Sequence, residues 1–542
     1  MDNITKTFNK YYNNKIIKPL QHEIVKNLLD NNNILAILPT GYGKSVCYQL
    51  VYLMDRTKYV IVISPLISLI KDQSDKLIEM NIPVECYHSE VKDIFQSNHS
   101  EGKIIFLTPE YFNKSKILIN NLKSKLSLVA IDEAHCISTW GHEFRPEYLE
   151  LKNIKEWIGN IPLIALTATA TKKVEDDIIK YLAVNDIKIF KTSFDRTNLY
   201  LEINRKPNKI NDIFTILDKY INDSVIIYCR TRKDTENIDK LLKENNYKSS
   251  LYHSKLKATE KIKIHEDFSN KIINIIVATT AFGMGIDQNI HLIIHWGCPS
   301  DMESYYQEIG RAGRDNLDAE CILYYEKKDY KINRLLIKDI DNIEHKRFKD
   351  EQISFMERFC ITLNCRRKII LEYFGENLSQ NYLCNKCDYC LNKIISNTNI
   401  SNNILYPLFI IIHTIYLIKY NIGIKKLSLI LKGSKLNIIN NFIYLPTYGI
   451  LKSLNEDQIK NLINILIINE YLKENDTKLG YGSIIELTIK AYNWYNKFPK
   501  QLNDLSYENL YILLNNNKIN INIPDFYKNI KNIKFNSLLD DI

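Results

Sequence analysis

Short apolar runs alternate with helix-length segments through the first part of the chain. The first series of runs comprises Ile34–Leu38, Tyr59–Ile63, Lys103–Leu107, Leu126–Ile131 and Pro162–Leu166. The same rhythm restarts at Ser224–Tyr228, Ile273–Ala278, His291–Trp296 and Glu320–Tyr325. Strands that alternate with helical segments are typical of a parallel, doubly wound sheet. The pattern therefore predicts two α/β domains in tandem, and the polar segment Thr192–Asn211 is the expected linker between them.

The pattern changes after about Tyr330. Charged helical sequence from Asn333 to Arg367 leads into a group of cysteines and a polar hinge, Ser396–Asn403. Apolar helical patterns and a hairpin over Tyr471–Leu487 then predict a winged-helix-like module. We therefore expect α/β domains over residues 1–200 and 201–330, a helical metal-binding subdomain over 331–400 and the winged-helix-like domain over 401–498. The Asn-rich tail, 499–542, is not expected to form a further complete domain.

Charge and hydropathy narrow the class of protein. The 542 residues include 72 Lys+Arg and 63 Asp+Glu, a net charge of +9, which permits a nucleic-acid partner without requiring one. The first residues are polar and are not followed by the apolar core of a signal peptide. The most apolar stretch, Leu408–Ile418, is too short for a membrane span and predicts a buried helix. We expect a soluble intracellular protein.

The strongest local signal is LPTGYGKS, directly after an apolar run. It comprises Leu38, Pro39, Thr40, Gly41, Tyr42, Gly43, Lys44 and Ser45. A glycine-rich turn between a strand and a helix lets backbone N–H groups surround phosphates, and the helix N-terminus favours negative charge. We expect Lys44 to reach the β- and γ-phosphates of a nucleotide and Ser45 to bind Mg²⁺. A chance Gly-Lys-Ser turn is the alternative.

Two carboxylates end a later apolar run, in the sequence Asp132-Glu133-Ala134-His135. This position is the carboxyl edge of a parallel sheet, where α/β proteins bind ligands. Asp132 would hold Mg²⁺, and Glu133 would orient and deprotonate an attacking water. An isolated Asp-Glu pair is more often a solvated loop, but the phosphate loop upstream favours the catalytic interpretation.

The second α/β domain supplies Arg311 and Arg314 within the sequence QEIGRAGRD, Gln307–Asp315. Two arginines among small residues suit insertion into a phosphate site at a domain cleft, where they would stabilise charge on the transferring phosphoryl group. A solvated basic helix start is the alternative.

Four of the 11 cysteines are grouped: Cys365, Cys384, Cys387 and Cys390. Three of them have two-residue spacing and can converge on one ion from a tight loop, while the fourth comes from the preceding helix. This pattern predicts a structural, tetrahedral Zn²⁺ site. The loss of one ligand is expected to unfold this small module before it affects catalysis.

The motifs in order resemble those of superfamily 2 helicases, and specifically the RecQ family of DNA helicases. They are LPTGYGKS, SPLISLIKDQ (Ser64–Gln73), LTPE (Leu107–Glu110), DEAH (Asp132–His135), LTATA (Leu166–Ala170), ATTAFGMGID (Ala278–Asp287) and QEIGRAGRD. Two features distinguish this family from other proteins with an Asp-Glu-Ala-His box. One is CISTWGHEFRPEY (Cys136–Tyr148), which resembles the family's aromatic-rich loop, and the other is the cysteine cluster.

The resemblance implies two RecA-like domains that bind ATP and Mg²⁺, a structural Zn²⁺, and 3′→5′ movement on single-stranded DNA that unwinds duplex DNA in repair, recombination or replication. It implies adenine recognition by Gln21, nucleotide contacts by Gly285 and Asp287, and coupling of DNA contact to domain closure by Thr167 and Thr169. The chain departs from the family pattern at Ile17, Lys18, Leu20 and Tyr42.

The aromatic-rich loop also has a direct physical interpretation. Trp140, Phe144 and Tyr148 offer faces for stacking bases, with His142 and Arg145 between them. Stacking of this kind binds single strands without sequence preference. A core aromatic cluster is the alternative.

The winged-helix-like region offers further candidates for DNA contact. Lys425, Lys432 and Lys435 are expected to bind phosphates, with solvated lysines as the alternative. In the hairpin, Tyr471 and Tyr481 are candidates for stacking at a wedge between base pairs.

Two other functions remain as alternatives to a DNA helicase. An RNA helicase or a nucleic-acid-remodelling ATPase would share the DEAH letters, but the Trp140 loop and the cysteine cluster count against it. The other alternative is a protein that binds nucleic acid but has lost ATP hydrolysis. Such a protein would not need the intact Lys44, Asp132 and Glu133. A nucleus and a viral or cytoplasmic DNA-replication site are both compatible with the sequence.

Overall fold

The computed structural model describes residues 2–12, 16–88, 101–138, 140, 145–184, 186–207, 213–280, 282, 288–362, 364–379, 381–395, 405–468, 471–476 and 483–496. They divide into two compact units. The first contains residues 1–360 with 366–388, and the second contains residues 361–365 with the described residues from 389 onward.

A seven-stranded sheet organises the first lobe of the first unit, with the strand order β3-β4-β2-β5-β6-β1-β7 and parallel pairing throughout. Its strands are β1 (Ile34–Ile37), β2 (Tyr59–Ile63), β3 (Val84–Tyr87), β4 (Ile104–Leu107), β5 (Leu126–Ile131), β6 (Leu163–Thr167) and β7 (Lys188–Lys191). The interior strands are buried almost throughout, which explains their continuous apolar runs. The two edge strands, β3 and β7, were not predicted because they are partly exposed and carry polar residues.

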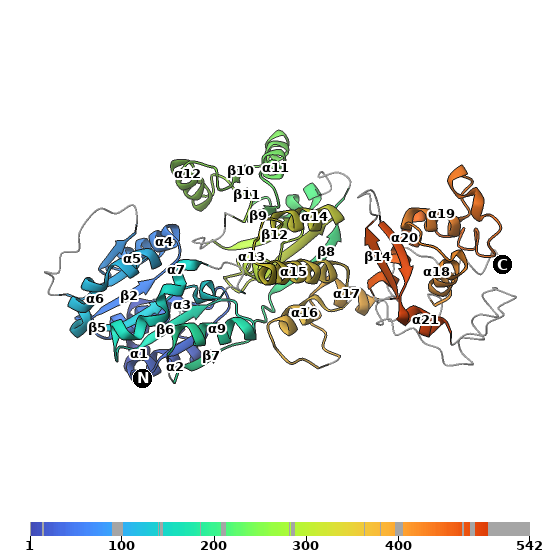
Figure 1. Cartoon of the computed structure of the whole chain (residues 1–542). Helices are drawn as coiled ribbons and strands as arrows, with labels where there is room; N and C mark the ends of the chain where they lie inside the picture. Colours follow the sequence, from blue (N-terminus) through green and yellow to red (C-terminus); the bar gives the residue numbers. More distant parts are fainter. Residues whose placement is uncertain are drawn as a thin grey trace. The chain divides into compact units, whose positions relative to one another are not determined.

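Helices connect these strands (Figure 1). They are α1 (Asn3–Tyr11), α2 (Pro19–Leu29), α3 (Lys44–Met54), α4 (Ile67–Glu79), α5 (Pro109–Lys114), α6 (Lys116–Leu122), α7 (Pro146–Leu149), α8 (Ile154–Ile158) and α9 (Lys172–Leu182), with 3-10 turns η1 (Lys123–Lys125), η2 (Ala134–Ile137) and η3 (Glu150–Asn153). α1, α2 and α3 contribute buried side chains to one cluster with β1, β2, β4, β5 and β6. This packing fixes the loop between β1 and α3 against the sheet.

A second parallel sheet of six strands organises the second lobe, in the order β10-β11-β9-β12-β13-β8. Its strands are β8 (Leu199–Arg205), β9 (Ser224–Cys229), β10 (Ser249–Tyr252), β11 (Ile275–Ala278), β12 (Ile290–Trp296) and β13 (Ala319–Tyr325). Its helices are α10 (Phe214–Leu217), α11 (Arg232–Glu244), α12 (Ala258–Ser269) and α13 (Met302–Ile309), with the 3-10 turn η5 (Asp218–Tyr220).

The two sheets confirm the predicted α/β fold class, but the predicted linker is wrong in extent. Residues 199–205 of the expected linker form β8, which pairs along its whole length with β13. Buried and half-buried residues alternate along β8, as on an edge strand, so its apolar positions are too sparse to form a continuous run.

Helices α14 (Lys327–Leu336), α15 (Ile343–Ile361) and α16 (Arg366–Tyr373) follow the second sheet, and α17 (Asp388–Ile395) begins within the cysteine cluster. They confirm the charged helical segment that the sequence predicted.

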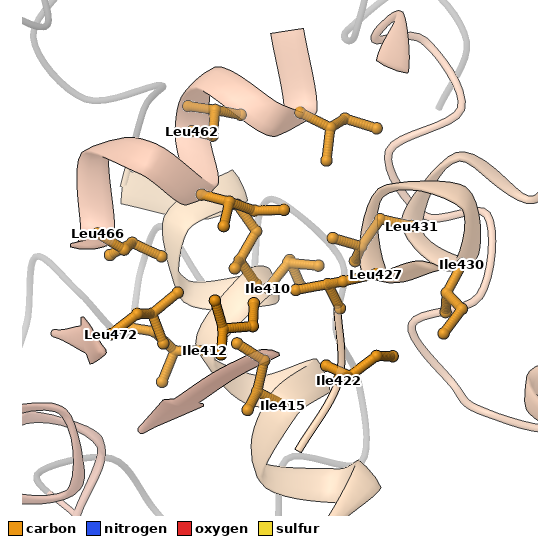
Figure 2. Packing of buried hydrophobic residues seen from close by; sticks show 14 of the residues in the cluster. Ile410, Ile412, Ile415, Ile422, Leu427, Ile430, Leu431, Leu462, Leu466 and Leu472 are labelled. Carbon is orange, nitrogen blue, oxygen red and sulfur yellow. The ribbon is translucent and has the colours of Figure 1, made fainter. Parts of the chain in front are cut away.

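The second unit is built from α18 (Leu405–Ile418), α19 (Ile424–Lys432), the 3-10 turn η6 (Asn437–Phe442), α20 (Glu456–Ile468), the antiparallel hairpin β14 (Leu472–Asp476) and β15 (Ser483–Leu487), and α21 (Ile489–Tyr495). Figure 2 shows side chains of α18, α19, α20 and β14 meeting in one apolar core. The predicted buried helix and hairpin are confirmed. The hairpin tip, which includes Tyr481, and the tail 499–542 lie outside the described residues. No helix within the described ranges is long and apolar enough to span a membrane.

Candidate nucleotide and metal sites

The predicted phosphate loop joins β1 to α3. Gly43 is the N-cap of α3 and has a left-handed backbone with φ of 88°. A Cβ at Gly43 would lie 2.6 Å from Nε2 of Gln21, so this position accepts only glycine. The loop therefore places the N-terminus of an 11-residue helix beside Lys44 and Ser45, the arrangement that anion binding requires.

The carboxylates Asp132 and Glu133 follow β5, two strands away from β1 in the same sheet. Asp132 is 7% exposed, and Glu133 has a left-handed backbone with φ of 47°. Burial, reinforced by the charge of Glu133, raises the pKa of Asp132 to about 7, while Lys44 opposes this shift. The two carboxylates therefore form a closely coupled pair in which positive charge is needed to keep both ionised.

A cleft of about 650 Å³ brings the predicted catalytic residues of both lobes together. Lys44, Asp132, Glu133, Arg311 and Arg314 all line it, as do Thr40, Gly41, Gly43 and Ser45. The arginines follow α13, and a Cβ at Gly310 would lie 3.0 Å from Cβ of Thr40, so the two loops are in close contact.

Two buried polar atoms at this cleft indicate a ligand. Oγ1 of Thr40 and Nε of Arg311 are buried and have no hydrogen-bond partner among the residues that the structure describes. Phosphate oxygens would accept hydrogen bonds from both groups. The donor set, with one lysine and two arginines opposite two carboxylates, fits a nucleotide phosphate with a divalent cation.

Gln21 does not line the cleft. Its side-chain amide donates to the backbone oxygens of Tyr42 at 2.9 Å and of Gly43 at 3.0 Å, and its Oε1 accepts from the N–H of Lys18. Gln21 thus stabilises the phosphate loop through hydrogen bonds to its backbone and does not face the cleft. The Lys18 ammonium lies 4.1 Å from the centre of the Tyr42 ring, so two departures from the family pattern contact each other.

The DEAH box contacts the predicted coupling motif directly. Nδ1 of His135 lies 3.3 Å from Oε2 of Glu133 and 3.0 Å from Oγ1 of Thr167. The Thr167 hydroxyl donates to the backbone oxygen of Thr169. A continuous polar path therefore links Glu133 to the loop after β6.

The aromatic-rich loop is partly described. The Trp140 ring packs edge-to-face on Phe348 of α15, and the Lys173 ammonium lies 3.1 Å from its centre. Arg145 donates to the backbone oxygen of Pro65 at 2.7 Å. The interpretation of Tyr148 as a stacking face is wrong, because its ring is buried and its hydroxyl donates to the backbone oxygen of Asp132.

Four predicted residues lie outside the described part of the chain: His142, Phe144, Gly285 and Asp287.

The four cysteines meet as the spacing predicts. The Sγ atoms of Cys365, Cys384, Cys387 and Cys390 all lie within 4.8 Å of one another. A tetrahedral Zn²⁺ with Zn–S bonds of about 2.3 Å needs sulfur atoms about 3.8 Å apart, so the set fits zinc with no open position. The site is therefore structural.

In the second unit, the lysines at 425, 432 and 435 are exposed on and after α19, where phosphates can reach them. Tyr471 is 3% exposed and packs edge-to-face on Trp494, so its interpretation as a wedge residue is wrong.

Arg196 is a further residue that the sequence did not single out, and it donates to four backbone carbonyls in the phosphate loop and in the loop after α13. Because its partners are backbone atoms, no motif marks it.

Four family profiles match the chain in succession. They are DEAD/DEAH box helicase over residues 18–177, helicase conserved C-terminal domain over 206–316, RecQ zinc-binding over 327–391, and RQC domain over 408–500.

The relatives agree with these profiles. The ATP-dependent DNA helicase RecQ of Bacillus subtilis is 36% identical over 454 residues, which cover 82% of this chain and 76% of that protein. RecQ of Haemophilus influenzae is 32% identical and covers 87% of this chain and 77% of that protein. A protein of Acanthamoeba polyphaga mimivirus that carries the name of an ATP-dependent RNA helicase is 39% identical, covering 88% of this chain and 89% of that protein.

A solved point variant of Saccharomyces cerevisiae Dbp5, bound to RNA and ADP BeF3, shares the fold. It has a TM-score of 0.50 and 18% identity and covers 73% of this chain and 96% of that chain. The family profiles and the relatives show that the chain belongs to the RecQ family of superfamily 2 DNA helicases.

Proposed function

We propose that the cleft between the two lobes hydrolyses ATP and that Lys44, Asp132, Glu133, Arg311 and Arg314 carry out this chemistry. Lys44 binds the β- and γ-phosphates, and the side chains of Ser45 and Asp132 would hold Mg²⁺. Mg²⁺, when bound with ATP, supplies positive charge that offsets the negative charge of the phosphate oxygens.

Glu133 orients the attacking water and accepts its proton. The water oxygen bonds to the γ-phosphorus while the bond from that phosphorus to the β,γ-bridging oxygen breaks, so ADP and phosphate leave. His135 positions the Glu133 carboxylate through the contact at 3.3 Å. Arg311 and Arg314 donate to the phosphoryl oxygens, where negative charge is distributed in the transition state.

The observation that supports this assignment is the convergence of five charged side chains on one cleft. They come from the turn after β5, from the start of α3 and from the loop after α13, which are far apart in the sequence. The unpartnered Nε of Arg311 and Oγ1 of Thr40 add to it, because each needs an acceptor that a phosphate would provide.

We further propose that hydrolysis drives 3′→5′ movement on single-stranded DNA, with Trp140 and Arg145 sensing the strand. The path from Glu133 through His135 to Thr167 and Thr169 would then couple the strand to the hydrolytic site. Opening duplex DNA costs about 1.4 kcal/mol per base-pair step, so turnover must be coupled to movement. Gln21 supports the phosphate loop, and Lys425, Lys432 and Lys435 bind duplex phosphates.

We propose domain boundaries at 330, 400 and 498, as the sequence predicts. The boundary between the two α/β domains, predicted after residue 200, instead lies before Leu199, because β8 belongs to the second sheet and pairs with β13. A nucleus or a viral or cytoplasmic DNA-replication site would supply the substrate.

The test is ATP hydrolysis by the wild-type protein, Lys44→Ala and Lys26→Ala, with single-stranded DNA, single-stranded RNA or neither. Lys26 is an exposed lysine of α2 and serves as the matched control. We expect stimulation by DNA alone, loss of turnover in Lys44→Ala and wild-type turnover in Lys26→Ala.

A second candidate is an RNA helicase, which the name of the mimivirus relative favours. Equal or greater stimulation by RNA would support it and overturn the DNA assignment. Full turnover in Lys44→Ala would remove the proposed role of the phosphate loop.

A further inference from the structure

The segment between β7 and β8 carries Arg196, whose guanidinium lies where the two lobes meet. Nη1 donates to the backbone oxygens of Thr40 at 3.1 Å and Gly310 at 3.2 Å. Nη2 donates to the backbone oxygens of Ala312 at 2.7 Å and Gly313 at 3.0 Å. These four bonds use all four N–H groups of the two terminal nitrogens. One side chain therefore joins the phosphate loop of the first lobe to the loop after α13.

The loop that Arg196 holds is the one that carries the cleft arginines. Arg311 lies between Gly310 and Ala312, and Arg314 follows Gly313, so their backbone neighbours are the acceptors of Arg196. Asn198 adds two bonds, to the backbone oxygens of Gly313 at 2.9 Å and Leu317 at 2.7 Å. Fixing these carbonyls fixes the direction in which the two arginines leave the backbone.

The backbone of Arg196 is itself held from the cysteine-bearing subdomain. Arg367 of α16 donates to the backbone oxygens of Arg196 and Leu199 and pairs with Asp195 at 2.7 Å. Arg367 is buried and lies two residues after the zinc ligand Cys365. Phe194 stacks on Phe374 of the same subdomain, with ring centres 4.4 Å apart. The position of the Arg196 guanidinium thus depends on α16.

Arg196 has a different role from the cleft arginines. It does not line the cleft, whereas Arg311 and Arg314 do. Its acceptors are neutral carbonyls, and no carboxylate pairs with it among the residues that the structure describes. A planar fork that reaches four carbonyls is a property of the guanidinium group, which an ammonium cannot reproduce.

We propose that Arg196 is a positioning residue for ATP hydrolysis, holding the loop that carries Arg311 and Arg314 against the phosphate loop. The zinc-binding subdomain holds Arg196 in turn through Arg367. The inference rests on the proposed roles of Arg311 and Arg314, because Arg196 acts only through them.

The first experiment measures DNA-stimulated ATP hydrolysis by the full chain with Arg196→Ala, Arg196→Lys and the control Arg205→Ala. Arg205 is an exposed arginine at the end of β8. We expect kcat of Arg196→Ala to fall about 10- to 100-fold, because a displacement of about 1 Å can cost that much. KM for ATP should change by less than about threefold, since Lys44 and Ser45 remain in place. Zinc content, measured per chain, should match the wild type.

Arg196→Lys separates positioning from charge. It keeps the positive charge but loses the fork, so its kcat should stay within about threefold of that of Arg196→Ala. Recovery to the wild-type kcat would overturn the proposal, because charge alone would then suffice. An equal loss in Arg205→Ala would overturn it as well.

A double-mutant cycle separates this inference from the proposed function. If Arg314→Ala leaves kcat unchanged, the proposed role of Arg314 fails. If Arg314→Ala lowers kcat, adding Arg196→Ala to the variant Arg311→Ala/Arg314→Ala should lower kcat by a further factor of less than about three, because both side chains that Arg196 positions are then already absent. Full multiplication of the two losses would show that Arg196 acts independently, which would overturn the inference alone.

Discussion

The buried ion pair between Arg366 and Asp388 should decide whether the zinc-binding subdomain keeps its metal. Nε of Arg366 lies 2.9 Å from Oδ1 of Asp388, and Nη2 lies 3.0 Å from Oδ2. The Arg366 side chain is 5% exposed and that of Asp388 is 14% exposed. Arg366 follows Cys365 directly, and Asp388 follows Cys387, so the pair joins two ligand-bearing segments. The perturbation is Asp388→Asn, which removes the charge and keeps the shape.

The size of the effect expected for Asp388→Asn follows from the burial of the Arg366 guanidinium. Burial by itself lowers the pKa of Arg366, but Asp388 outweighs this effect and the net shift is upward. Without that carboxylate the buried guanidinium loses its ion-pair partner, a change that costs about 3–5 kcal/mol. Asparagine leaves no cavity, so no packing loss adds to this figure. Because folding of a zinc module is linked to metal binding, a loss of about 3 kcal/mol corresponds to about 100-fold weaker zinc binding.

The assay is competition for zinc between the full chain and a chromogenic chelator. The matched control is Asp318→Asn, since Asp318 is 79% exposed and pairs with Lys386 at the surface. A surface pair contributes at most about 1 kcal/mol to stability. The zinc affinity of this control should therefore lie within about fivefold of the wild-type value.

Equal zinc release by Asp388→Asn and Asp318→Asn would refute the reasoning, because it would mean that water replaces the lost carboxylate. The double variant Arg366→Met/Asp388→Leu provides a second check. Apolar residues in place of both partners leave no buried charge, so this variant should regain most of the lost affinity.

Three further predictions concern the cleft, a buried acid and the second unit. Glu133→Gln should lower kcat about 10²- to 10⁴-fold with ATP binding retained, measured by hydrolysis and nucleotide titration; unchanged kcat would exclude Glu133 as the base. Burial, and then the charge of Asp301, raises the pKa of Glu303 to about 7 from 4.5, so wild-type stability should fall as pH rises between these values. Glu303→Gln should therefore be more stable than the wild type at pH 8 and equal to it at pH 4 in urea unfolding, and the reverse order would contradict the shift. Ile410→Ala should destabilise the second unit by about 2–5 kcal/mol, whereas Ile438→Ala, 65% exposed, should change it by less than about 0.5 kcal/mol in the same unfolding assay.

The sequence predicts the strands that are buried on both faces and misses those that are not. β1, β2, β4, β5 and β9 appear as apolar runs because helices cover both sides of the sheet. The edge strands β7 and β8 expose alternate or most residues, so their composition resembles a loop.

The candidate site likewise contains some residues whose roles the sequence predicts and others whose environment it does not predict. Lys44, Asp132 and Glu133 are predictable because their chemistry requires a local sequence at a strand end. The burial of Tyr148 and Tyr471 is not, since an aromatic ring suits a core and a stacking platform equally well. Only the tertiary packing decides between the two.

The contacts of Arg367 also change the expected order of events when zinc is lost. The cysteine spacing alone predicts that the module unfolds before catalysis is affected. In the structure, however, the residue two positions after Cys365 holds the backbone of Arg196, and Arg196 holds the cleft arginines. Release of zinc should then loosen α16 and lower kcat together, whereas Arg196→Ala should lower kcat with zinc still bound. A chelator titration that follows zinc release and ATP turnover in one sample distinguishes these orders, because turnover should fall in proportion to bound zinc if the path through Arg367 operates.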